Sequence, residues 1–118
     1  MTEQDKALYE YYRSIPVGKE YATSRSTLCR QWNTNDRTVR NIISEIRLNC
    51  RRLAMAYFVV SDSHGKGYWR TSDKQEIRAF NEQMMSRVNN IIPAVQNASK
   101  YLHDAQHDAQ TDLFGGMY

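Results

Sequence analysis

Two segments decide the fold of this 118-residue chain: STLCRQWNTNDRTVR at residues 26–40 and YFVVSDSHGKGYWR at residues 57–70. The first segment predicts a short helix over residues 27–32, a polar turn at residues 33–35 and a second helix that begins at Asp36. The second segment predicts a strand over residues 57–60, a loop over residues 61–67 and a short strand over residues 68–70. The rest of the chain is interpreted outward from this order of helix, turn, helix and hairpin.

The helix that begins at Asp36 has two chemically distinct faces. With Asn35 as its N-cap, it is expected to continue to about Leu53. Its apolar face should pack on Leu28 and Trp32, and consists of Val39, Ile42, Ile43, Ile46 and Cys50. Its opposite face carries Arg37, Asn41 and Ser44, flanked by Arg40, Arg47 and Arg51. The outward face is therefore expected to be cationic and rich in hydrogen-bonding groups.

The flanking sequence predicts a first helix over residues 2–14, capped by Thr2 and ended by Pro16 and Gly18. Residues 19–22 are expected to add one short strand to the hairpin. We expect a domain over residues 1–72, a helical extension over residues 73–103 and a flexible tail over residues 104–118. The fold class is therefore α+β and mostly helical, with one small domain and an appendage.

Positive charge is concentrated in the middle of the chain. Residues 21–70 hold nine Arg and Lys against three Asp and Glu, which gives +6. Because the whole chain has a net charge of +3, the remaining residues carry −3. Such a concentration is expected of a surface that binds phosphates. The competing interpretation, residue by residue, is that these arginines form an ordinary solvated face.

The composition also excludes several classes. The two cysteines, Cys29 and Cys50, belong to no paired motif, so we expect reduced thiols in a cytoplasmic protein. We expect no targeting segment and no membrane span. His103 and His107 are spaced as metal ligands could be, but no third ligand is evident, so no metal or other cofactor is expected. No nucleophile–base motif or phosphate-binding glycine loop is present, and an enzyme is not expected.

The extension has apolar residues spaced by seven. One series is Ile77, Met84, Ile91 and Ala98, and the other is Val88, Val95 and Leu102, with Phe80 beside them. This approximates a heptad repeat and indicates a homodimer through Ile77, Met84, Val88 and Ile91. The alternative is a helix that packs back on its own domain. Pro93 predicts a kink or a division into two helices.

Residues 2–70 resemble a winged helix-turn-helix domain of the small bacterial and phage regulator type, which has a three-helix core and a two-stranded β-hairpin wing. The resemblance rests on NDRTVR at residues 35–40, which opens the second helix of the motif, and on GKGY at residues 65–68, which closes the wing. The chain departs from this pattern where it inserts residues 51–56 before the first wing strand. The resemblance implies that the helix from Asp36 enters the major groove of double-stranded DNA.

Carried over by position, the resemblance implies base contacts by Arg37, Arg40, Asn41 and Ser44. It implies phosphate and wing contacts by Thr38, Arg47, His64, Lys66 and Arg70. Two copies could then contact half-sites about one helical turn apart. An exposed Tyr68 or Trp69 would instead favour binding of single strands.

The tail contains a second short motif, QTDLF at residues 110–114. It resembles the peptide by which bacterial replication and repair proteins bind the DNA polymerase sliding clamp, although Thr111 departs from the leucine usual there. The resemblance implies contacts by Gln110, Leu113 and Phe114. The alternative is that Leu113 and Phe114 fold back on the domain.

Three functions follow from these observations. The first is sequence-specific binding of double-stranded DNA by a transcriptional regulator of bacterial, phage or mobile-element origin. The second is a replication accessory protein that is recruited to the sliding clamp by its tail. The third is an adaptor whose winged domain binds another protein.

Overall fold

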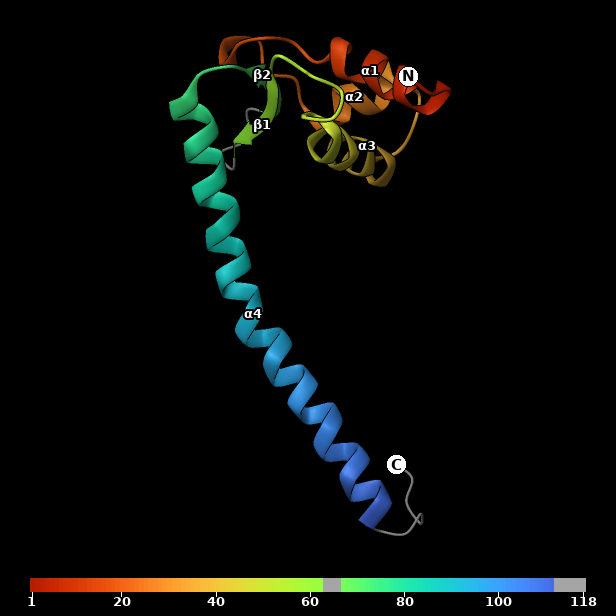
Figure 1. Ribbon diagram of the computed structural model, residues 1–118, viewed down its shortest axis with the longest axis vertical. Coiled ribbons are helices and arrows are strands. Elements are labelled where there is room, and N and C mark those ends of the chain that lie inside the picture. The colour runs from red at the N-terminus through yellow and green to blue at the C-terminus, as the bar shows by residue number, and fades with distance from the viewer. Residues whose placement is uncertain (63–66, 112–118) are drawn as a thin grey trace. The chain divides into compact units, whose positions relative to one another are not determined.

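The computed structural model describes residues 1–62 and 67–111, and the side-chain surroundings of these residues up to Asp104. In chain order the elements are α1 (Glu3–Ser14), the 3₁₀ helix η1 (Lys19–Tyr21), α2 (Arg25–Gln31), α3 (Asp36–Asn49), β1 (Phe58–Asp62), β2 (Gly67–Thr71) and α4 (Lys74–Thr111). Helices followed by a two-stranded antiparallel hairpin and a long helix confirm the α+β, mostly helical class and are compatible with a winged helix (Figure 1).

The first three helices begin where side chains cap them. The Thr2 hydroxyl accepts a hydrogen bond from the Asp5 N–H at 3.0 Å, and the Asp5 carboxylate accepts one from the Thr2 N–H at 3.3 Å. The Ser24 hydroxyl caps α2 by accepting from the Thr27 N–H at 3.1 Å. The Asn35 side chain caps α3 by accepting from the Thr38 N–H at 2.8 Å. These caps satisfy donors that a helix start leaves unpaired, and so they fix where each helix begins.

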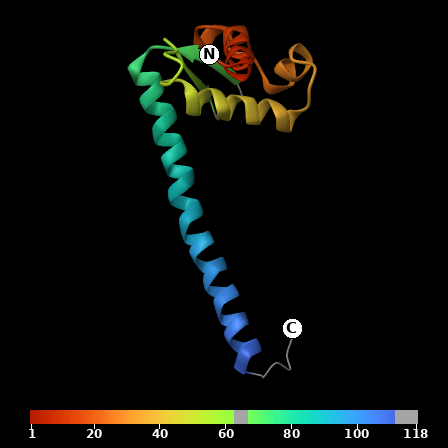
Figure 2. The same ribbon diagram turned by 45° about the vertical axis from the view of Figure 1, so that its right-hand side comes forward.

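The helix α3 is the centre of the N-terminal unit, which spans Met1–Phe80. It contacts α1, α2 and β1, and Figure 2 shows it side-on with α1 above it. The side chains of its inward face join a core built from α1, α2 and both strands. The core residues are Tyr12, Ile15, Leu28, Val39, Ile43, Ile46, Val59 and Tyr68.

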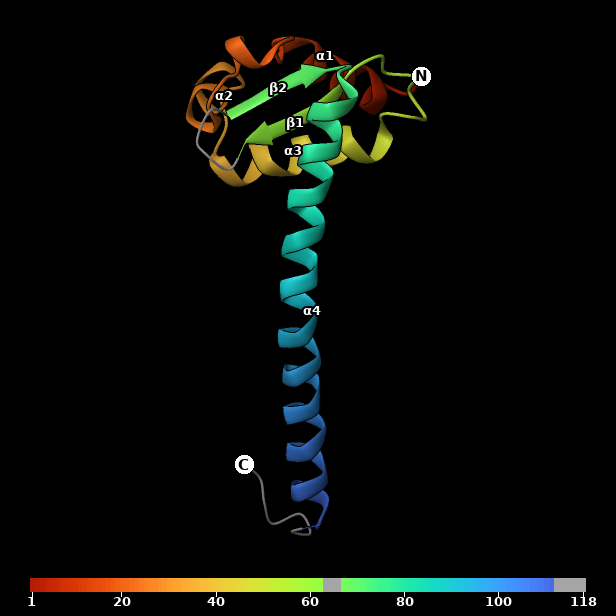
Figure 3. The ribbon, with the colours of Figure 1, turned by 90° about the vertical axis from the view of Figure 1, so that its left-hand side faces the viewer.

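The hairpin pairs Val60 with Trp69 and Phe58 with Thr71 in antiparallel register (Figure 3). Its outer edge is covered by the chain between α1 and α2, through bridges from Val17 to Arg70 and from Thr23 to Tyr68. A second, smaller core forms where Val60 and Trp69 meet Phe80 of α4. The first turns of α4 therefore belong to the N-terminal unit, which ends at Phe80.

Three sequence expectations about the elements need correction. Residues 19–22 do not form a strand, because Gly18, at φ +103°, turns the chain into η1 and leaves the sheet contacts to Val17 and Thr23. The helix α3 ends at Asn49 instead of Leu53, and the chain turns through Ala54 in a left-handed conformation at φ +52°.

The third correction concerns α4. Pro93 lies inside one helix that continues to Thr111, so the alternative of two helices is wrong. A proline removes one backbone donor, but the residues on both sides of Pro93 remain helical. The residues that follow position 103 contain no glycine or proline before Gly115, and the helix continues into the segment expected to be a tail.

Candidate nucleic-acid interface

The rotation of α3 about its axis is fixed by its buried face. Val39, Ile43 and Ile46 are each at most 2% exposed. The residues on the opposite side are consequently held toward solvent, and Arg37, Arg40, Asn41 and Ser44 are all exposed. All four base-contact residues inferred from the sequence therefore share the accessible side of one helix.

Leu48 belongs to the same exposed side and was missed by the sequence analysis. Its side chain is 78% exposed, an unusual position for a leucine in a small domain. The signal was present in the spacing, because Arg37, Asn41, Ser44 and Leu48 follow one another at intervals of four, three and four residues. We call these four residues the α3 outer stripe.

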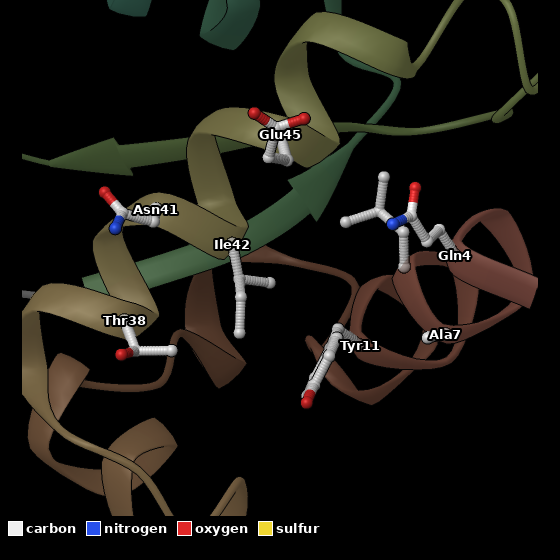
Figure 4. Close-up of a pocket in the computed structure, with 8 residues that line it drawn as sticks. Gln4, Ala7, Tyr11, Thr38, Asn41, Ile42 and Glu45 are labelled. Carbon is white, nitrogen blue, oxygen red and sulfur yellow. The ribbon is translucent and has the colours of Figure 1, made fainter.

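One flank of the α3 outer stripe borders an apolar groove between α3 and α1. The groove has a volume of about 240 Å³ and is lined by Gln4, Ala7, Leu8, Tyr11, Thr38, Asn41, Ile42 and Glu45. Figure 4 shows Ile42 of α3 and Tyr11 of α1 on its two sides, with Asn41 and Thr38 along the α3 rim. Thr38, a phosphate contact inferred from the sequence, is thus half-buried beside the groove. The carboxylate of Glu45 adds negative charge on this flank.

The other flank carries a small charge cluster at the start of α3. The Asp36 carboxylate lies 3.3 Å from Arg40 and also accepts a hydrogen bond from Arg25 of α2. Hydrogen bonds to Tyr68 and to Asp36 raise the pKa of the Arg25 guanidinium. These contacts bring the starts of α2, α3 and β2 together. The part of the hairpin nearest its tip therefore adjoins the start of α3.

Arg37 differs from these paired cations. Within the described part of the chain, no acidic side chain forms an ion pair with it, whereas Arg25 and Arg40 both contact Asp36. The Arg37 guanidinium, the one cation of the α3 outer stripe, is therefore more available to a ligand than the guanidinium groups of Arg25 and Arg40.

Arg47 and Arg70, inferred from the sequence as phosphate contacts, have their guanidinium groups bonded within the domain. Arg47 donates to the Val59 carbonyl at 2.9 Å and lies 4.4 Å above the Phe80 ring, where burial lowers its pKa to about 10. Arg70 donates to the Ile15 carbonyl at 2.6 Å and lies 4.8 Å above the Tyr12 ring. Both side chains connect the sheet to the helices, and neither guanidinium is part of the proposed DNA-binding surface.

The remaining residues inferred from the sequence fall outside what the structure describes. His64 and Lys66 lie in the hairpin loop beyond the described residues, as do Leu113 and Phe114 of the clamp-like motif. Gln110 is described only as part of the α4 backbone. Of the residues that the structure describes, Lys19 is a basic residue near the hairpin loop. Its ammonium group lies 3.8 Å from the Asp62 carboxylate.

The described part of the chain holds no cluster of three or more side chains that could bind a metal ion. Within residues 1–62 and 67–111, no helix is both long and apolar enough to span a lipid bilayer.

Comparison with known proteins identified no relative of this chain. No protein-family model matches the chain, and neither a curated protein nor a solved structure shows significant similarity to it.

Proposed function

We propose that the N-terminal unit is a winged helix-turn-helix domain that binds double-stranded DNA sequence-specifically, with α3 in the major groove. The observation that carries this proposal is the division of α3 into a face that is at most 2% exposed and an opposite face that presents Arg37, Asn41 and Ser44. A major groove accommodates one α-helix, and these side chains provide the donors and acceptors that distinguish base pairs there.

Each residue of the α3 outer stripe has a distinct expected role. The Arg37 guanidinium suits the two acceptors of guanine, and the Asn41 amide suits the donor and acceptor of adenine. Ser44 can hydrogen-bond either base. The exposed methyl groups of Leu48 suit contact with a thymine methyl group. Affinity independent of sequence would come from exposed cations of the N-terminal unit, namely Arg25, Arg30 and Arg51, and Arg40 can add to either kind of contact.

The cellular role that fits best is a transcriptional regulator of bacterial, phage or mobile-element type. The net charge of +6 over residues 21–70 supports duplex binding, and the sequence resemblance supports this class of regulator.

The test is selection of bound sequences from a random duplex pool, followed by affinity measurements on the selected site at several salt concentrations. Arg37→Ala and Asn41→Ala should each reduce discrimination between the selected site and unrelated duplexes by about 1–3 kcal/mol. Lys66→Ala should weaken binding to all duplexes about equally. The matched control is Arg13→Ala on α1, where the arginine pairs with Glu10 at 3.6 Å outside the α3 outer stripe.

Arg13→Ala should leave the discrimination between the selected site and unrelated duplexes unchanged. A folded protein that shifts no duplex at low salt would overturn the proposal and favour the adaptor function. Equal losses for Arg13→Ala and Arg37→Ala would show that the α3 outer stripe is not the recognition surface.

The QTDLF motif at residues 110–114 supports a second candidate, recruitment to a polymerase sliding clamp during replication. A Leu and Phe pair in a polar segment can enter an apolar pocket on a partner while Gln110 sets the register. Replacing Leu113 and Phe114 together by alanine should abolish retention on immobilised clamp and leave DNA affinity unchanged. Absence of clamp binding by the full chain would exclude this function.

A further inference from the structure

The part of α4 that belongs to the C-terminal unit, from Asn81 onward, exposes a row of large apolar side chains. Among residues 81–104, Met84, Val88, Ile91, Val95 and Leu102 are between 36% and 68% exposed. A soluble helix normally buries such a row against another element. Ile77, which the sequence analysis grouped with them, packs instead on the core formed by Val60, Trp69 and Phe80. The exposed row thus begins after Phe80.

The spacing of this row is that of a coiled coil. Together with Asn81 and Ala98, the row forms a heptad pattern in which successive positions are three and four residues apart. Position a is occupied by Asn81, Val88, Val95 and Leu102, and position d by Met84, Ile91 and Ala98. Three heptads in one continuous register form a narrow seam along a single face. The occupant of such a seam is another helix with the same repeat.

We propose that residues 81–102 of α4 form a parallel, two-stranded coiled coil with a second copy of this chain. The seam is self-complementary, because the same alternation on two helices allows each side chain to enter a hole on the other. Charge does not oppose the pairing: residues 81–104 contain Glu82 and Asp104 against Arg87 and Lys100, a net charge of zero.

The positions outside the seam are compatible with this partner. Pro93 falls at position f, the position farthest from the seam, so its ring and missing donor lie away from the partner helix. Ile92 falls at position e, where a parallel partner presents position g of the preceding heptad, which is Arg87. The aliphatic part of an arginine can cover an apolar side chain while its charge stays in water.

Two features favour two strands in parallel orientation. Val88 and Val95 place β-branched side chains at position a, as in parallel dimers, although Ile91 at position d departs from the leucine usual there. Asn81 is the one polar residue among the a and d positions of residues 81–102. In a parallel pair it meets Asn81 of the other copy and the two amides can hydrogen-bond, whereas an antiparallel pair would leave each amide against an apolar residue.

The first test is the mass of the full chain at micromolar concentration, measured by light scattering during size-exclusion chromatography. We expect twice the monomer mass for the wild type and the monomer mass when Val88 and Val95 are both replaced by aspartate. The control is Ser86→Asp at position f, which adds one aspartate on the outer face of the same helix and should keep the dimer. A monomeric wild type, or a complex of three or more copies, would overturn the proposal.

The second test establishes the orientation of the two helices. Cys29 and Cys50 are first replaced by serine, and then Val88→Cys and Leu102→Cys are made separately and oxidised. In a parallel coil both positions face their own copies, so both variants should form disulfide-linked dimers in high yield. In an antiparallel coil of residues 81–102 only residues next to the centre, Ile91 and Ile92, face themselves, so failure of either cysteine variant to cross-link would overturn the parallel arrangement. The coiled coil is independent of DNA binding, and both tests are made without DNA.

Discussion

Gly67 is the first residue of β2, and its backbone lies against the backbone of Thr23. Its φ is +94°, and a Cβ added there would lie 2.1 Å from the Thr23 carbonyl oxygen. We therefore expect Gly67→Ala to lower the free energy of unfolding by about 3 kcal/mol or more, measured by urea denaturation.

Gly18 provides the matched control. Its φ of +103° is equally unfavourable for alanine, but the nearest atoms to an added Cβ are side-chain atoms at 3.5 Å or beyond. Gly18→Ala should therefore cost only the backbone term, about 1–2 kcal/mol. Equal losses for the two variants would show that crowding at Thr23 plays no part.

Asp5 connects the start of α1 to the turn after α3. Its carboxylate accepts hydrogen bonds from the Arg52 guanidinium at 2.7 and 3.1 Å, and these hold the pKa of Asp5 far below its usual range. Because the folded pKa lies below the unfolded value of about 3.9, this contribution to stability is complete above that value and is lost as the pH falls through the folded pKa.

We therefore expect wild-type stability to fall more steeply below about pH 4 than that of Asp5→Asn, in chemical denaturation measured across a pH series. Glu10→Gln removes an exposed carboxylate that pairs with Arg13 at 3.6 Å, and should keep the wild-type pH dependence. Parallel pH profiles for wild type and Asp5→Asn would contradict this account.

The roles of individual polar side chains were the least predictable from sequence. The Tyr12 hydroxyl accepts from the Tyr57 N–H at 2.9 Å and donates to its carbonyl at 3.0 Å, a contact across 45 residues. Arg47 and Arg70 likewise bond carbonyls of distant segments. No local pattern shows which backbone groups a fold leaves in need of a partner, and arginines in a basic segment are easily counted as solvent-facing.

At the scale of the element, α3 shows how one sequence period serves both packing and the proposed recognition. Leu48→Ala should change the free energy of unfolding by less than about 0.5 kcal/mol, because the side chain is 78% exposed. Ile46→Ala, two residues earlier on the buried face at 1% exposure, should cost about 2–5 kcal/mol. Denaturation measures both values.

Leu48→Ala should also weaken binding of the protein to the selected DNA site. Unchanged affinity would remove Leu48 from the proposed interface.

The elements with strong local signals were predicted close to their observed bounds. The caps at Thr2 and Asn35 predicted the starts of α1 and α3, and the runs at residues 57–60 and 68–70 around a glycine-containing loop predicted the hairpin. The 3₁₀ helix at Lys19–Tyr21 was missed because its β-like neighbours, Val17 and Thr23, contact the sheet from either side of it. The continuity of α4 was missed because a proline inside a helix was given more weight than the helix-forming residues around it.

At the scale of the whole molecule, the two proposed functions fall in parts of the chain that differ in charge. The excess of +6 lies within residues 21–70, and residues 81–104 are neutral and expose an apolar seam. Both features were visible in the sequence. That Ile77 and Phe80 belong to the N-terminal unit could not be deduced, because their apolar character fits a heptad as well as a core.

A dimer formed through α4 would carry two copies of the α3 outer stripe, so its preferred DNA site should contain two related half-sites. Once one half-site is bound, the second α3 binds at an effective concentration set by the connection between the copies. Replacing Val88 and Val95 by aspartate should therefore lower affinity for the selected two-half-site duplex by about 100-fold or more, while affinity for a single half-site stays the same. Gel-shift titration on both duplexes measures the two values, with Ser86→Asp as the control. Full affinity of the aspartate variant for the longer site would show that one copy suffices, and a loss on both duplexes would indicate damage to the N-terminal unit.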